Sequence, residues 1–165
     1  MPLTKPELLT PTHSVGDFAC GEALLDDWLK KRALANQHSG ASRTFVVADE
    51  TGAVQGFYAL AAGAVSHQMA SSRLKRNMPD PVPVIVLARL AVAQSYHGRK
   101  VGPALLKDAL LRVVHIASHA GVRAVLVHAL HEEAKGFYEH YGFKVSPIHS
   151  MALMIAVSDI LAQQI

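Results

Sequence analysis

The first half of the chain shows a helical apolar period followed by a strand-like one. In residues 17–37 a turn at Cys20-Gly21 precedes an amphipathic stretch, which predicts a helix. Its apolar side chains recur at helical spacing: Leu24, Leu25, Trp28 and Leu29. In residues 43–66, β-branched and aromatic runs flank a short turn around Thr51-Gly52. This pattern predicts a β-hairpin.

The second half alternates between buried strands and helices. Residues 67–83 are polar, basic and proline-rich, which predicts a long loop. Residues 82–94 form a near-continuous β-branched run, typical of a central strand buried on both faces. Residues 103–121 have helical spacing, with Pro103 suited to the first turn. A strand, a short helix and a final strand are then predicted: 122–130, 132–141 and 150–158. The order predicts a mixed α/β fold in one domain, residues 1–165.

Composition narrows the class of protein. Half of the residues are apolar and 18% are charged, which excludes a disordered chain. The net charge of +3 permits anionic partners such as a cofactor phosphate or RNA. The single Cys20 excludes an intrachain disulfide and suits a reducing compartment. No leader or membrane-spanning run is evident, so we expect a soluble, cytoplasmic protein.

The stretch "YHGRKVG", residues 96–102, joins the predicted central strand to the predicted helix. A glycine-bearing turn at this place presents backbone N–H groups and the positive end of a helix to an anion. Neither the Walker A pattern nor the Rossmann G-x-G-x-x-G is present. Two interpretations therefore stay open from the residues alone: an anion-binding loop, or a turn with solvated cations.

Two blocks resemble motifs of the GNAT N-acetyltransferase superfamily. Residues 97–102 resemble its pyrophosphate loop, [QR]-x-x-G-x-[GA], but His97 replaces Gln or Arg and Lys100 replaces the first glycine. "HEEAKGFYEHYGF", residues 131–143, resembles N-x-x-A-x-x-[FL]-Y-x-x-x-G-F, with His131 in place of Asn. The resemblance implies a mixed central sheet flanked by helices, with acetyl-CoA bound at a splayed strand pair.

A narrower resemblance covers nearly the whole chain. The blocks "DFACGEALLDDWLKKRA", "HSGASRTFVV", "GFYALAAGAVS" and "VPVIVLARLAV" are similar to the acetyltransferase toxins of type II toxin–antitoxin pairs. That family implies acetylation of the α-amino group of aminoacyl-tRNA, which blocks translation. It also implies a ribbon–helix–helix antitoxin, repression of operator DNA through the toxin–antitoxin complex, and a homodimer.

The same resemblance assigns the cofactor site. Backbone groups of the central strand should hold pantetheine and the thioester: Leu90, Ala91 and Val92. The remaining predicted acetyl-CoA contacts are His97, Gly98, Arg99, Lys100, Val101, Gly102, Pro103, His131 and Tyr138.

The general acid of the family maps to Tyr141. A phenol of pKa about 10 can protonate a thiolate as it forms. From the residues alone, an aromatic residue packed at a helix end is the favoured interpretation of Tyr141. Tyr138, one turn earlier, suits a packing role or the cofactor wall. An aminoacyl α-amine is less basic than lysine and is largely neutral near pH 7, so a strong protein base is dispensable.

Several cations are candidates for RNA contact: Arg43, Arg73, Lys75, Arg76 and Arg89. For any one of the first four, a solvated loop residue is an equal interpretation. Arg89 interrupts an apolar strand, which favours a wet groove near RNA or cofactor. The histidine pairs lack H-E-x-x-H or a cysteine partner, so we predict no metal.

Other functions stay open on sequence grounds. The acceptor could be a small amine, an antibiotic or a protein N-terminus. Alternatively, the chain could be a weakly catalytic co-repressor that acts with its antitoxin. The sequence does not name the aminoacyl-tRNA.

Overall fold

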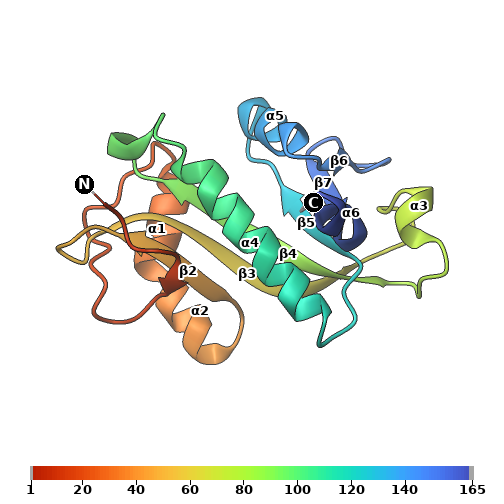
Figure 1. Cartoon of the computed structure of the whole chain (residues 1–165), viewed down its shortest axis with the longest axis horizontal. Coiled ribbons are helices and arrows are strands. Elements are labelled where there is room, and N and C mark those ends of the chain that lie inside the picture. Colours follow the sequence, from red (N-terminus) through yellow and green to blue (C-terminus); the bar gives the residue numbers. More distant parts are fainter. Residues whose placement is uncertain (1, 164–165) are drawn as a thin grey trace. The chain divides into compact units, whose positions relative to one another are not determined.

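The computed structural model describes residues 2–163 of the 165-residue chain. Its strands form one mixed seven-stranded sheet in the order β1-β2-β3-β4-β5-β7-β6, accompanied by helices (Figure 1). The strands are β1 (Glu7–Leu8), β2 (Arg43–Ala48), β3 (Val54–Val65), β4 (Val82–Val92), β5 (Ala124–His128), β6 (Lys144–Val145) and β7 (Ala152–Ala156). The helices are α1 (Ala23–Lys31), α2 (Ala33–Ser39), α3 (Ser72–Lys75), the 3₁₀ turn η1 (Gln94–Tyr96), α4 (Val101–Ala117), α5 (Glu132–His140) and α6 (Val157–Ala162). The predicted α/β class is confirmed.

The chain divides into two compact units. Unit 1 contains Met1–Ala61 and Ala88–Ala109, and unit 2 contains Ala62–Leu87 and Leu110–Ile165. Three elements, β3, β4 and α4, contribute residues to both units. The prediction of one domain over the whole chain stays a prediction.

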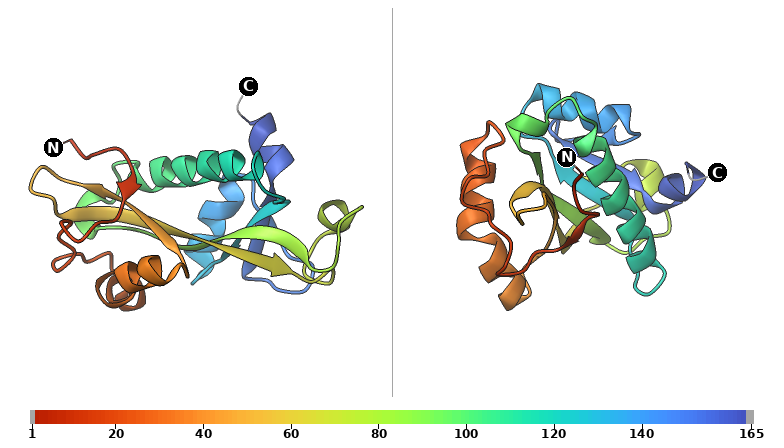
Figure 2. Two further views of the ribbon diagram at one scale, coloured as in Figure 1. Left: turned by 90° about the horizontal axis from the view of Figure 1, so that it is seen from below. Right: turned by 60° about the vertical axis from the view of Figure 1, so that its left-hand side comes forward.

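In unit 1 the predicted hairpin is present. β2 and β3 are antiparallel, with Phe45 opposite Tyr58, and Gly52 in the turn has a φ of +87° that favours glycine. Helices α1 and α2 lie on one face of these strands and the first half of α4 on the other (Figure 2). α4 lies close to β3, because a Cβ at Gly56 would meet Leu105 at 3.0 Å. The β-hairpin predicted for residues 43–66 is thus confirmed.

The single helix predicted after Cys20 is two helices. The chain breaks at Arg32, whose φ of −123° and ψ of −33° end α1 and begin α2. Leu29 is buried as expected, but Leu24 is 74% exposed, so its assignment to the apolar stripe is wrong. The remaining stripe residues pack against Phe57 and neighbouring core residues.

In unit 2, β4 and β5 run parallel over Val84–Val86 and Ala124–Leu126, and β5 pairs antiparallel with β7. The predicted splay of β4 from β5 stays a prediction. The predicted loop contains the short helix α3, whose first turn is capped by the Ser71 side chain. The elements that the sequence did not predict are short: β1, α3, η1, β6 and α6.

The described helices include none that combines the length and apolar character needed to cross a bilayer.

Candidate functional site

The loop between β4 and α4 has the backbone of a glycine-rich anion loop. After β4 ends at Val92, η1 and a turn lead directly into α4 at Val101. Gly98 has a φ of +77° and Lys100 a φ of +63°. Lys100 therefore adopts the left-handed conformation that glycine supplies most easily. The lysine at the motif's glycine position therefore has the backbone conformation that a glycine adopts without strain.

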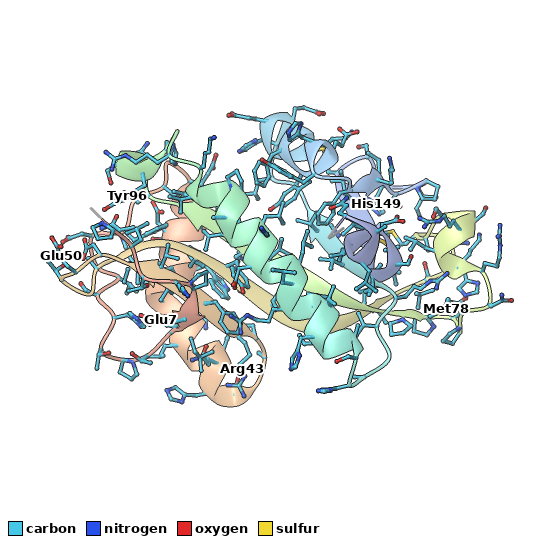
Figure 3. The ribbon with its side chains drawn as sticks, viewed as in Figure 1. Glu7, Arg43, Glu50, Met78, Tyr96 and His149 are labelled. Atoms are coloured by element: carbon cyan, nitrogen blue, oxygen red, sulfur yellow. The ribbon has the colours of Figure 1, made fainter. Side chains whose placement is uncertain are left out.

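The N–H groups of this loop are available to an anion. Within residues 2–163, the backbone N–H groups of residues 98–102 make no hydrogen bond of good geometry to a backbone carbonyl outside the helices and strands. They lie at the first turn of a 17-residue helix, where N–H groups lack intrahelical partners and the helix dipole is positive. Arg99 and Lys100 are exposed, and the Arg99 guanidinium lies 5.0 Å from the centre of the Tyr96 ring. Figure 3 shows Tyr96 at this end of α4. The loop suits a pyrophosphate group.

Replacing Lys100 with glycine should preserve the fold and the cofactor loop. Glycine removes the left-handed strain of the lysine, so the free energy of unfolding should not fall and can rise by up to about 1 kcal/mol. Acetyl-CoA affinity should stay within about threefold, since the backbone N–H donors remain. Thermal unfolding and calorimetry measure both. Gly98→Ala is the matched control: nothing lies within 4 Å of its added Cβ, so strain alone should lower stability.

His97 ties the loop to the end of the strand. Its Nε2 lies 2.8 Å from the carbonyl oxygen of Val92, so the ring N–H donates to that carbonyl. Ala91 is buried, whereas Leu90 and Val92 are partly exposed. In this structure His97 holds the loop onto β4. Its predicted contact with the cofactor stays a prediction.

In unit 2, the second motif block forms α5 and its caps. His131 is the N-cap: its Nδ1 accepts the N–H of Ala134 at 3.1 Å. Asparagine is a favoured N-cap because its side chain also offers an acceptor, so histidine replaces the motif's Asn in the same local role. A direct role of His131 toward acetyl-CoA stays a prediction.

The two candidate tyrosines have different surroundings. Tyr138 is 6% exposed, and its ring meets Phe137 and Phe143 edge-on, each at 5.3 Å. Burial raises the pKa of the Tyr138 hydroxyl above its ordinary value. Tyr141 is the C-cap of α5 and is partly exposed, with its ring edge against Phe137 at 5.2 Å. Tyr138 packs in the core and Tyr141 is more exposed, and the assignment of the general acid to Tyr141 stays a prediction.

Arg73 is already engaged within unit 2. Its two terminal nitrogens donate to the two oxygens of Asp159, each at 2.6 Å, which joins α3 to α6. This contact holds the pKa of the Asp159 carboxyl below its ordinary value. Arg123 donates to the carbonyls of Leu74 and Arg73 from the other side. The Arg73 side chain is exposed, but its predicted RNA contact competes with the bond to Asp159. Arg76 is exposed and Lys75 is partly exposed.

Exchanging the charges of Arg73 and Asp159 distinguishes two roles of Arg73: an anchor for α3 and a contact with RNA phosphate. If charged tRNA is the acceptor, as the sequence resemblance implies, Arg73→Asp should raise its KM, because α3 loses its anchor. The double variant, Arg73→Asp with Asp159→Arg, should return the KM to near the wild-type value, because the ion pair re-forms with its two charges exchanged. If Arg73 contacts phosphate instead, the swap will stay as impaired as the single variant. Steady-state kinetics on the wild type, the two single variants and the double variant distinguish the two roles of Arg73.

Arg89 is accommodated in β4 by an aromatic platform. Its guanidinium carbon lies 5.1 Å from the centre of the Trp28 ring, and its Nη1 donates to the Ala88 carbonyl at 2.7 Å. Trp28 in turn stacks on Phe57, with 6.0 Å between the ring centres. The cation–π contact explains how a charge interrupts an apolar strand. Arg43 lies exposed at the start of β2, where Figure 3 labels it.

Two further chemistries have little support in the described residues. Burial raises the pKa of the Cys20 thiol to about 11, so it is protonated at neutral pH and is a poor nucleophile. Among residues 2–163, no three His, Cys, Asp or Glu side chains gather as a metal site would require.

Sequence reasoning missed two partners that complete these contacts. Asp159 follows Arg73 by 86 residues, and no local pattern connects them. Trp28 was assigned only to the helix stripe. Its pairing with Arg89 depends on α1 packing beside β4. The isolated cation in an apolar strand was the available signal, because such a charge needs a partner.

A protein-family model, the acetyltransferase (GNAT) domain, matches residues 40–145. This span includes both motif blocks, residues 97–102 and 131–143. The chain belongs to the GNAT acetyltransferase family. The GNAT fold and the acetyltransferase activity predicted from the sequence are confirmed.

Curated relatives and solved structures support the membership in the GNAT family. A tRNA-acetylating toxin of Mycobacterium tuberculosis is 51% identical over 93% of this chain and 92% of its own. The probable toxin TacT of Sinorhizobium fredii is 28% identical over 90% of this chain and 87% of its own. A structure of AtaT complexed with acetyl-methionyl-tRNAfMet has a TM-score of 0.90 and 25% identity, with 98% of this chain and 99% of that chain covered. A structure of AtaTR bound with AcCoA has a TM-score of 0.85 and 26% identity over 98% of this chain and 97% of that chain.

Proposed function

We propose that this GNAT acetyltransferase is a toxin that uses acetyl-CoA to acetylate the α-amino group of aminoacyl-tRNA and so blocks translation. The observation that carries the proposal is the 51% identity to a tRNA-acetylating toxin over nearly the full length of both chains. The identity extends beyond the family motifs into the N-terminal part of the chain, because it covers 93% of the sequence, whereas the family model begins at residue 40.

The residues of unit 1 suit acetyl-CoA, which supplies the acetyl thioester. The N–H groups of residues 98–102 and the start of α4 would hold the pyrophosphate, supported by the exposed charges of Arg99 and Lys100. The backbone of Leu90–Val92 would hold the pantetheine arm. Binding in this way orients the thioester at the end of β4, so much of the rate enhancement comes from positioning.

In unit 2, Tyr141 is the proposed general acid. Acetyl transfer needs a neutral amine and a proton for the departing thiolate. The α-amine of an aminoacyl ester is largely neutral near pH 7 and needs no strong base. Tyr141 meets the other need because its phenol is partly exposed, while that of Tyr138 is buried in the core.

The proposed acceptor surface includes Arg43, Lys75, Arg76 and Arg89. These cations are exposed or partly exposed. Phosphate contacts by such side chains should make tRNA binding fall as salt rises. The proposed location is the cytoplasm, because charged tRNA is found there.

Antitoxin and operator DNA are proposed partners. Among structures similar to this chain are AtaTR bound with AcCoA and the KacTA–DNA complex, each 26% identical. A ribbon–helix–helix antitoxin and a homodimer remain proposals that follow from the sequence resemblance.

Induced expression in cells tests the function. The wild-type protein should arrest growth, and mass spectrometry of the aminoacyl ends of extracted tRNA should find N-acetylated amino acids. Coexpression with the neighbouring antitoxin gene should relieve both effects. Growth arrest without acetylated tRNA would favour another acceptor, and absence of both effects would favour the co-repressor alternative.

A further inference from the structure

The segment from the end of α1 through β2 carries positive charge and no acidic residue. Residues 28–48 carry four cations and no acidic residue, whereas the rest of the chain has 12 cations and 13 acidic residues. The four cations are Lys30, Lys31, Arg32 and Arg43, and all four side chains are exposed. Lys31 approaches Asp27 only at 3.9 Å, as an exposed pair that contributes little. We call these four residues the α1–α2 elbow.

The helix dipoles explain only part of this cluster. Lys30 and Lys31 lie in the last turn of α1, where cations stabilise the negative helix end. Arg32 is both the C-cap of α1, where a cation is favourable, and the N-cap of α2, where a cation is unfavourable. Arg43 lies beside the other end of α2, with its Nη1 3.5 Å from the Gln37 carbonyl. The two helix ends therefore act on Arg32 in opposite senses and do not account for its exposed charge.

The elbow is continuous with the strand proposed to hold the cofactor. Arg89, next to Leu90 on β4, rests on the ring of Trp28 in α1. Lys31 and Arg32 follow Trp28 by three and four residues, so they lie on the same side of the helix. Within unit 1, cationic groups therefore run from β4 along α1 to the break between the helices.

We propose that the α1–α2 elbow binds the phosphate backbone of the acceptor tRNA, while its aminoacyl end lies at Arg89 and β4. This inference rests on the proposed function, because it needs an RNA whose reacting end is at the cofactor strand. A surface with four exposed cations, of which only Lys31 has an acidic neighbour at 3.9 Å, suits a polymer of uniform negative charge better than a protein surface of mixed charge. The contacts would fix the position of the RNA without reading its sequence.

The test compares two double variants that remove the same charge. Lys30→Gln with Arg32→Gln alters the elbow, and Lys5→Gln with Lys107→Gln alters two exposed lysines of unit 1 elsewhere. For the elbow variant we expect a KM for charged tRNA at least about fivefold higher, an unchanged kcat, and a salt slope of log KM that is smaller by about 2. The control variant should keep wild-type values. Both should bind acetyl-CoA as the wild type does.

A phosphate-free acceptor completes the test. With a 3′-aminoacyl adenosine, the elbow variant should match the wild type, because no phosphate contact can be lost. An equal loss on this acceptor, an equal loss in the control variant, or an unchanged salt slope would each overturn the inference. If the elbow variant keeps its KM for charged tRNA but no longer binds the antitoxin, the elbow binds an acidic protein instead of RNA. If the wild type acetylates no charged tRNA at all, the proposed function itself fails.

Discussion

Replacing Tyr141 with phenylalanine should lower the single-turnover rate of acetyl transfer by about 10²–10⁴-fold, the usual contribution of a positioned general acid. The change removes one hydroxyl from a partly exposed helix cap and keeps the ring that contacts Phe137. The fold and the affinities for acetyl-CoA and tRNA should therefore stay unchanged. Rapid-quench kinetics at saturating substrates isolate the chemical step, and calorimetry gives the two Kd values.

Tyr138→Phe is the matched control, since it removes the same atom three residues earlier. The Tyr138 hydroxyl is buried, so its loss should affect stability and leave the rate nearly intact. If Tyr138→Phe loses turnover while Tyr141→Phe keeps it, the general acid is Tyr138 and the assignment to Tyr141 is wrong. If neither variant slows the reaction, the proton comes from water or from another residue.

Replacing Gly102 with aspartate should weaken acetyl-CoA binding by at least about tenfold, or 1.4 kcal/mol. Gly102 lies in the first turn of α4, beside the N–H groups proposed to hold the pyrophosphate. A carboxylate there would repel the phosphates and occupy their donors. Because an acidic side chain is favourable in the first turn of a helix, the melting temperature should not fall.

Gly102→Ala separates charge from bulk at the same position. It adds a methyl group without charge, so most of the affinity should remain. Calorimetry on both folded variants makes the comparison. Unchanged acetyl-CoA affinity in Gly102→Asp would show that the pyrophosphate lies elsewhere.

Local patterns predicted the elements that position the site. The sequence predicts β4, α4 and the glycine-bearing turn between them, because each of these elements depends on residues that are neighbours in the chain. Lys100 replaces a motif glycine, and the structure gives it a φ of +63°, a conformation that glycine adopts most easily. The backbone of the candidate cofactor loop could therefore be inferred from one sequence.

Contacts between distant segments could not be predicted in this way. The break at Arg32 follows a run with continuous helical propensity, and the exposure of Leu24 depends on which side of α1 packs. The clamp of Arg73 on Asp159 and the platform of Trp28 under Arg89 join segments far apart in the chain. These contacts change the roles expected of the cations, because a guanidinium held by a carboxylate is less available to phosphate.

Acetyl transfer to purified charged tRNA tests the central proposal most directly. Total tRNA, aminoacylated and then incubated with the protein and acetyl-CoA labelled in the acetyl group, should acquire label that is released as N-acetyl amino acid on mild alkaline hydrolysis. Deacylated tRNA should acquire none, and identifying the labelled amino acid names the acceptor. Labelling of deacylated tRNA, or none of the charged tRNA in a preparation that binds acetyl-CoA, would contradict the proposed function.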